Sequence, residues 1–296
     1  MTNSSFIPNT TLQHAWDSTS LRAIKECPRK YFYSIVQGWQ PRETSVHLIF
    51  GLHYHSALER YDHAKAAGAS HEDAQRQALH HAMVVTWDSS KGRPWLSDDP
   101  NKNRWTLIRS VVWYLEQFAN DPLETVILAN GKPAVELSFR WQTSYTNSYT
   151  DAPFFYCGHI DRLATLDGNP YVLDRKTSKS SIDTNFFSKF SPDTQLTGYE
   201  VSANVVYSVP VLGVIVDAVQ TGANFSRFAR QTIPRHESQR QEWYEGLQFW
   251  LSLAEHFART GNYPMNEQSC GNYGGCSFRE ICSKPASSRE MWLRAS

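Results

Sequence analysis

The chain has 296 residues, and 41% of them are hydrophobic, which is enough for a sizeable buried core in one or two domains. Because 29 basic residues balance 29 acidic ones, the composition excludes a general positive field, and any nucleic-acid binding must come from a local groove. The N-terminus lacks a secretory pattern, and the longest apolar stretch, Val209 to Val219, is too short to span a bilayer, so we expect a cytoplasmic protein without membrane contact.

The first part of the chain is predicted to be helical. Ser18 or Ser20 is a candidate N-cap for the first helix, which is interrupted near Pro28. Ser70 and Asp73 resemble a capping box for the third helix, and a polar loop follows over residues 89–102. The expected helices cover residues 18–33, 47–67, 70–88 and 103–119.

Strand patterns begin after these helices. Apolar and polar residues alternate over 135–141, which is typical of a half-buried strand, and Asp167–Gly168 is a favoured turn between two further strands. The remaining expected elements are strands over 154–165, 170–176, 211–219 and 225–233, and helices over 193–208 and 236–260.

This order of elements predicts an α/β fold with one core and a helical subdomain that is built from both ends of the chain. We expect an N-terminal helical region over 1–125, the core over 126–235, and a C-terminal helix with a cysteine-rich region over 236–296.

Two short motifs carry the candidate chemistry, Gly158-His159-Ile160-Asp161 and Asp174-Arg175-Lys176. Side chains alternate along a strand, so Asp174 and Lys176 project from the same face, and a hairpin can bring Asp161 close to Asp174. Two converging carboxylates suit a hard cation such as Mg²⁺ or Mn²⁺, and an adjacent ammonium can orient a water or offset the charge of a phosphate. Taken alone, however, the triplet favours an exposed strand end with solvated charges, and only the accompanying residues change this interpretation.

Three other residues accompany these motifs. His55 shares a helical face with Leu48 and Leu52 and is expected to point inward, either as a buried core histidine or as a third metal ligand. Gln195 and Tyr199 are four residues apart on a predicted helix and present an amide and a phenol on one face. They are suited to hold a phosphate or a base near the metal, or they are ordinary surface polar residues.

The series Gly-x(3)-His-x(3)-Glu, Gly-x-Ile-Asp-Arg, Asp-x-Lys and Gln-x(3)-Tyr, in this order, resembles the RecB-like branch of the PD-(D/E)XK nucleases. The resemblance implies a restriction-endonuclease-like core, in which a central mixed sheet is flanked by helices. It implies metal binding by His55, Asp161, Asp174 and the Arg175 carbonyl, a catalytic role for Lys176, and an accessory role for Gln195 and Tyr199. It also implies a less uniform acidic position at Glu136.

Four cysteines lie near the two ends of the chain: Cys27, Cys270, Cys276 and Cys282. In a reducing compartment such a set favours Zn²⁺ or an iron–sulfur cluster over disulfides. The resemblance implies a [4Fe–4S] cluster that joins the two ends, but the five residues between Cys270 and Cys276 depart from the tighter spacing common in the family and leave zinc as an alternative. Cys157, within a predicted strand, is expected to be a small buried apolar residue.

These features together predict a metal-dependent deoxyribonuclease, with exonuclease action on DNA ends or single strands in recombination, repair or DNA processing as the leading activity. A non-catalytic DNA-binding module, or a zinc-stapled subunit of a helicase–nuclease complex, is the alternative. No phosphate loop of the Gly-x(4)-Gly-Lys-[Ser/Thr] form occurs, so a helicase would have to be a partner.

Overall fold

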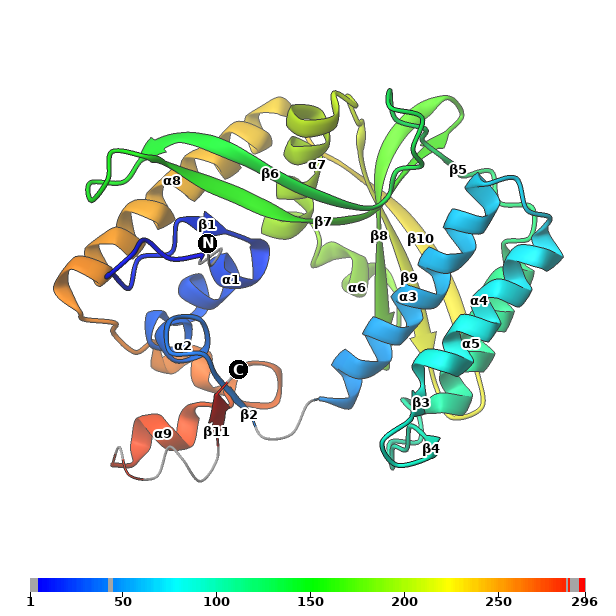
Figure 1. Ribbon diagram of the computed structural model, residues 1–296, viewed down its shortest axis with the longest axis horizontal. Coiled ribbons are helices and arrows are strands. Elements are labelled where there is room, and N and C mark those ends of the chain that lie inside the picture. The colour runs from blue at the N-terminus through cyan, green and yellow to red at the C-terminus, as the bar shows by residue number, and fades with distance from the viewer. Residues whose placement is uncertain (1–4, 42–44, 286, 288–292, 296) are drawn as a thin grey trace. The chain divides into compact units, whose positions relative to one another are not determined.

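The computed structural model describes residues 5–41, 45–285, 287 and 293–295. The chain divides into two compact units, both of which combine segments that are distant in sequence (Figure 1). Unit 1 contains Met1–Thr44, Arg140–Gly158 and Glu237–Ser296, and unit 2 contains Ser45–Phe139 and His159–His236. The three consecutive regions predicted from the sequence therefore do not coincide with these units, because each unit closes its core with segments from different parts of the chain.

Unit 2 is built on a mixed sheet in the order β7–β8–β9–β10. Strand β8 (Asn169–Ser178) is antiparallel to β7 (Pro153–Leu166) and parallel to β9 (Gly213–Thr221), which is antiparallel to β10 (Ser226–Pro234). Every residue of β9 is buried, which explains its nearly continuous apolar sequence. Two further strands, β5 (Glu124–Thr125) and β6 (Val135–Thr146), also pair with β7.

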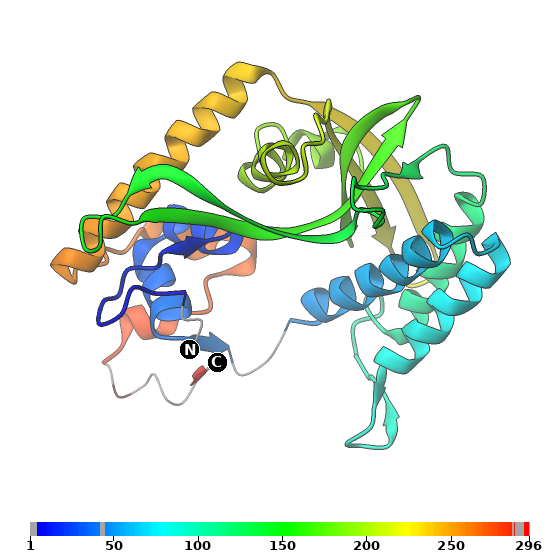
Figure 2. The same cartoon turned by 45° about the horizontal axis from the view of Figure 1, so that its top comes forward.

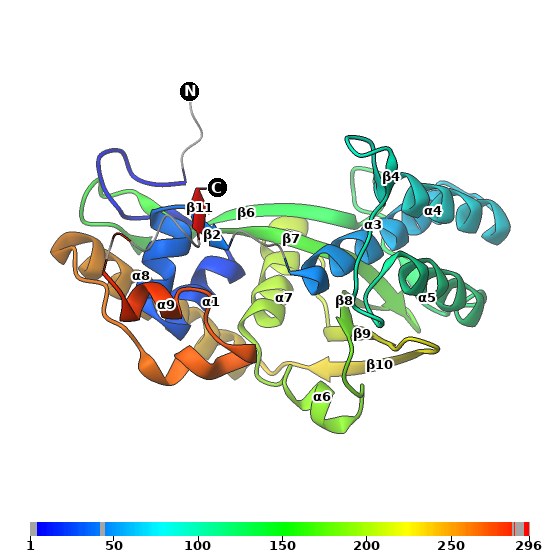
Figure 3. The same ribbon diagram turned by 90° about the horizontal axis from the view of Figure 1, so that it is seen from below.

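Helices cover both faces of this sheet. Figures 1 and 2 show α3 (Val46–Ala66) and α5 (Arg104–Gln117) on one side of β8–β10 and α7 (Thr194–Tyr207) on the other. Figure 3 shows α4 (His71–Val85) beside α3 and α5. The buried cluster between these three helices and β9 contains Phe50, Tyr54, Ala57, Leu58, Ala78, Ala82, Leu107, Val111, Tyr114, Leu115 and Val219. Between β8 and β9 the chain forms α6 (Thr184–Ser188) and α7, as a parallel connection requires.

Unit 1 is largely helical. It contains α1 (Ser18–Glu26), α2 (Pro28–Tyr31), a π-helical turn over Phe32–Val36, α8 (Glu237–Thr260), a 3₁₀ helix over Glu267–Gly274 and α9 (Arg279–Ser283). Its short strand β1 (Ala15–Trp16) pairs with Phe155 and Tyr156, in the part of β7 that belongs to unit 1, and β2 (Trp39–Pro41) pairs with β11 (Leu293–Ala295). The Trp16 and Tyr31 rings stack in its interior with centroids 5.3 Å apart.

The mixed α/β fold with a central sheet flanked by helices is confirmed. Two local predictions were wrong. The N-cap of α1 is Asp17, whose side chain accepts from the Ser20 N–H, so Ser20 is the capping-box partner and not the cap. The third predicted helix ends at Val85, and Trp87–Asp88 instead forms β3, which pairs with β4 (Arg93–Pro94) inside the expected loop. Among the helices formed by the described residues, none is long and apolar enough to cross a membrane.

The start of α5 provides a test of local stability. Asn103 accepts hydrogen bonds from the backbone N–H groups of Trp105 and Thr106 in a full capping box. We expect Asn103→Ala to reduce the free energy of unfolding by about 1 kcal/mol, as loss of an N-cap typically does. Thermal or urea unfolding measures the loss. Asn103→Asp keeps the accepting oxygen and should unfold close to the wild type; equal losses for both variants would show that the cap does not stabilise α5.

Candidate functional site

The two candidate carboxylates lie where the pairing of β7 with β8 ends. Arg162 and Leu173 are the last paired residues, and Asp161 and Asp174 are each the next residue beyond them. The backbone N–H of Arg175 donates to Asp161 Oδ2 at 2.8 Å, so a carboxylate replaces a strand carbonyl at this point. The predicted convergence of Asp161 and Asp174 is therefore present in the structure.

Lys176 lies at the start of a chain of polar contacts that leads from β8 to α7. Its Nζ is 2.7 Å from Asp174 Oδ2 and donates to Gln195 Oε1 at 3.0 Å. Gln195 Nε2 in turn donates to the Tyr199 hydroxyl at 3.0 Å. Of the two residues predicted to act on the substrate side, Gln195 thus contacts the lysine directly, and Tyr199 contacts Gln195. Their catalytic role stays a prediction.

His55 is brought to the same site by α3. Its Nδ1 lies 3.3 Å from Asp161 Oδ2, and its side chain is half-buried. His55 therefore points inward as expected, but Leu48 and Leu52, which were expected on the same inward face, are 67% and 66% exposed. The core stripe of α3 instead runs through Phe50, Tyr54 and Leu58, which leaves His55 at the edge of the core and accessible from outside.

The charges at the site determine each other's protonation. Burial would disfavour charge on Asp161, but the His55 imidazole and the Arg175 N–H outweigh burial and hold the Asp161 pKa far below its usual range. Burial and the neighbouring Asp161 raise the pKa of Asp174 to about 6, although Lys176 opposes this shift. Burial opposes charge on His55 and Lys176 as well, yet their acidic partners raise both pKa values.

Glu136 on β6 adds a further carboxyl group near Asp161. Its φ of 48° is left-handed, which is unusual for a non-glycine residue within a strand. Burial, and then the charges of Asp161 and Glu59, raise the pKa of Glu136 to about 7. Residues with such a backbone are often found at functional sites, so this geometry favours the acidic role that the resemblance implied for Glu136, which stays a prediction.

Asp62 and Arg162, two charged residues to which the sequence suggested no role, lie next to these groups. Asp62 on α3 binds the guanidinium groups of both Arg162 and Arg175. Asp62 could have been noticed in the sequence, because it lies about two helical turns after His55 and thus on the same side of the helix. No spacing rule, however, predicts that both arginines converge on it.

The donor set His55, Asp161 and Asp174, with Glu136 nearby, consists of the nitrogen and oxygen ligands that divalent cations use. In the parts of the chain that the structure describes, no three or more His, Cys, Asp or Glu side chains already form a closed metal-binding group. The ion pairs of Asp161 with His55 and of Asp174 with Lys176 occupy the carboxylates instead. A cation would therefore have to replace these contacts, in which His55 and Lys176 compensate the negative charge of the two carboxylates.

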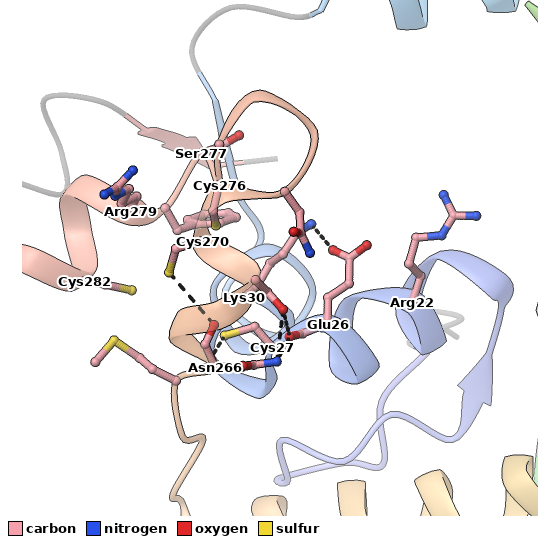
Figure 4. Close-up of a pocket in the computed structure, with 15 residues that line it drawn as sticks. Arg22, Glu26, Cys27, Lys30, Asn266, Cys270, Cys276, Ser277, Arg279 and Cys282 are labelled. Carbon is pink, nitrogen blue, oxygen red and sulfur yellow. Dashed lines mark hydrogen bonds and ion pairs between the residues drawn. The ribbon is translucent and has the colours of Figure 1, made fainter. Parts of the chain in front are cut away.

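The four predicted cluster cysteines all belong to unit 1 and line one cavity of about 300 Å³. Figure 4 shows their sulfur atoms gathered in one part of this cavity, and Cys27 accepts from the Asn266 N–H at 3.4 Å. None of the five cysteines, all of which lie in described segments, forms a disulfide. Cys157, which was expected to be buried, is only half-buried; its thiol donates to the Trp16 carbonyl, and it does not line this cavity.

Comparisons with known proteins give one family match and solved structures of low sequence identity. The family description "PD-(D/E)XK nuclease superfamily" matches residues 16–283. A solved structure from Eubacterium rectale, described as a "putative exonuclease", is 11% identical, covers 86% of this chain and 85% of its own, and has a TM-score of 0.50, so it is similar in fold. The structure of SSO0001 is 13% identical, covers 91% of this chain and 86% of its own, and has a TM-score of only 0.37. No curated protein matches the chain. Since the family match extends over most of the sequence and includes every residue of the candidate site, the chain belongs to the PD-(D/E)XK nuclease superfamily.

Proposed function

We propose that this nuclease is a Mg²⁺- or Mn²⁺-dependent deoxyribonuclease of the RecB-like branch, and that unit 2 contains its active site. Two neighbouring sets of contacts carry the proposal. His55 pairs with Asp161, which accepts from the Arg175 N–H, and Asp174 pairs with Lys176, which donates to Gln195. The order of these residues in the chain matches the RecB-like motif series, and their side chains lie together in one site.

The residues that would hold the cation are His55, Asp161, Asp174 and the carbonyl of Arg175. Members of this superfamily usually use Mg²⁺ or Mn²⁺, which when bound supplies Lewis acidity and an activated water for phosphodiester hydrolysis. Asp161 is poised for this role because its low pKa keeps it ionised, and the Arg175 N–H fixes its orientation.

Lys176 contributes a fixed positive charge. Asp174 raises the pKa of Lys176 despite burial, so the side chain is an ammonium at neutral pH and acts as a hydrogen-bond donor to water or phosphate, not as a base. The Lys176 ammonium donates one hydrogen bond to the Gln195 amide oxygen, and the Gln195 amide nitrogen donates to the Tyr199 hydroxyl. Positive charge is thereby directed at the place where a phosphate would develop negative charge.

We propose exonuclease action on DNA ends or single strands, with a helicase or recombination factor as a compatible partner. The RecB-like order of the motifs supports this choice, and a protein of similar fold is described as a "putative exonuclease". Time courses with end-labelled single- and double-stranded DNA test it: release of mononucleotides or short fragments from an end supports the proposal, whereas cleavage of covalently closed circles contradicts it.

For unit 1 we propose that Cys27, Cys270, Cys276 and Cys282 hold a [4Fe–4S] cluster, with Zn²⁺ as the alternative. The support is chemical: four thiols line one cavity, and their segments lie at the two ends of the chain. Burial, and to a smaller degree the nearby thiols, raise the pKa of Cys282, so a cation that favours thiolates would bind in exchange for protons.

The first prediction concerns the catalytic pair. Lys176→Ala and Asp174→Ala should each lower the cleavage rate by about 100-fold or more, because each removes charge that acts on the transition state. DNA affinity and thermal unfolding should change little by comparison. Lys179→Ala is the control, since Lys179 is an exposed lysine close to the end of β8. Wild-type turnover by Lys176→Ala, or cleavage that persists in excess chelator, would contradict the mechanism.

The second prediction concerns pH. His55 and Asp174 both have raised pKa values, and both must lose their protons to act as ligands. The half-saturating Mn²⁺ concentration for cleavage should therefore fall as the pH rises from about 5 to about 8. Mn²⁺ titrations at fixed ionic strength measure this change, and His55→Asn should make it shallower. A metal requirement that is constant over this range would exclude both residues as ligands.

The third prediction concerns the cysteines. Anaerobically purified protein should be brown and contain iron and acid-labile sulfide. Serine at any of the four positions should lower the iron content and the melting temperature, because the free energy of metal binding also stabilises the fold. Cys157→Ser is the control and should retain iron. A colourless protein with one zinc per chain would refute the iron–sulfur cluster and leave the nuclease proposal intact.

A further inference from the structure

The residue after each candidate metal-binding aspartate is an arginine: Arg162 follows Asp161, and Arg175 follows Asp174. Because neighbouring side chains on a strand point to opposite faces, these arginines leave the sheet away from the aspartates. Their side chains are 6% and 3% exposed, so both positive charges are buried.

Both guanidinium groups converge on one acid, Asp62 of α3. Arg175 Nη2 donates to Asp62 Oδ2 at 2.7 Å, and Arg162 Nη1 donates to Asp62 Oδ1 at 3.3 Å. Arg162 also donates to the Leu123 carbonyl at 2.8 Å. Asp62 is only 2% exposed, and one carboxylate thus ties α3 to β7 and β8 at once.

These contacts close a loop with the active site. Asp62 holds Arg175 through its side chain, the backbone N–H of Arg175 holds Asp161, and Asp161 pairs with His55. His55 and Asp62 lie on the same helix, about two turns apart. The segment of α3 from His55 to Asp62 is therefore held to the sheet at both of its ends. This fixes how closely His55 approaches Asp161.

This arrangement is a costly way to gain stability. Buried ion pairs lose much of their attraction to desolvation, and well-packed apolar side chains often stabilise a core as well or better. The Nε atoms of both arginines have no hydrogen-bond partner among the described residues, which adds to the cost. A buried group of this kind is better explained by the geometry that it imposes than by the stability that it contributes.

We propose that Asp62 is a positioning residue of the nuclease site: through Arg175 and Arg162 it sets the spacing of His55, Asp161 and the Arg175 backbone that a divalent cation requires. This inference rests on the proposed function. It predicts that loss of the Asp62 charge weakens metal binding in protein that is still folded.

The experiment compares Asp62→Asn with Asp217→Asn. Asp217 on β9 is equally buried at 2% exposure, and it contacts Tyr114 and the Arg230 guanidinium. It lies beside Arg175 in the β8–β9 register, and its negative charge also acts on Arg175, but among the described residues it accepts no hydrogen bond from Arg162 or Arg175. It therefore controls for the loss of a buried charge near Arg175 without the direct hydrogen bonds. Mn²⁺ binding in the absence of DNA is measured by electron paramagnetic resonance, together with thermal unfolding, kcat and KM for DNA, and the metal dependence of cleavage.

We expect Asp62→Asn to weaken Mn²⁺ binding by about 10- to 100-fold, as loss of groups that orient metal ligands typically does, and to leave KM for DNA within about 3-fold at saturating metal. Asp217→Asn should destabilise the fold to a similar degree and retain wild-type Mn²⁺ affinity. Wild-type affinity in Asp62→Asn, or equal weakening by both variants, would overturn the positioning role.

If Asp62→Asn does not fold, Arg175→Lys decides the question, because it keeps the positive charge opposite Asp62 but loses the planar fork. Weakened Mn²⁺ binding in this folded variant supports the inference, and unchanged binding overturns it. If the wild type itself neither binds Mn²⁺ nor cleaves DNA, the proposed function fails, and the inference that rests on it fails as well. A wild type that binds and cleaves, beside an Asp62→Asn variant that does the same, refutes the inference alone.

Discussion

The central constraint in this nuclease is the repulsion between two carboxylates, Asp161 and Asp174, that the end of the β7–β8 pairing brings together. Like charges in a partly buried site are unfavourable unless opposite charges or donors compensate them. Here His55 and the Arg175 N–H compensate Asp161, and Lys176 compensates Asp174. Burial and the Asp161 charge nevertheless keep the pKa of Asp174 raised, so additional positive charge at the site would stabilise its ionised form. A bound divalent cation would supply this positive charge.

The alternation of side chains along β8 divides the chemistry between two helices. Asp174 and Lys176 project toward α7, where Gln195 and Tyr199 orient the ammonium. Arg175 projects toward α3 and is held by Asp62. The Asp174–Lys176 segment of β8 therefore presents its reactive side chains on one face of the sheet, while Arg175 anchors it on the opposite face. Contacts on both faces thus fix its backbone. Such double support is what a site needs when small displacements change metal affinity.

The two compact units contain separate chemistry. All residues of the candidate nuclease site belong to unit 2, and the four cysteines belong to unit 1. Substitution of these cysteines is therefore expected to act on unit 1 first, through the stability of its α1–α2 and C-terminal segments. For this reason the cysteine variants and the catalytic variants test independent parts of the function.

The sequence by itself determined most of the helices and strands and the α/β class, because these follow from local periodicity, and its ordered motifs predicted which residues form the candidate site. It could not determine that Asp17 caps α1, that Leu48 and Leu52 are exposed, or that Glu136 has a left-handed backbone. Only the tertiary structure decided that Gln195 holds Lys176 and that Asp62 binds both Arg162 and Arg175. These are contacts between residues far apart in the chain, and their existence depends on how α3 and α7 pack on the sheet, which no local pattern encodes.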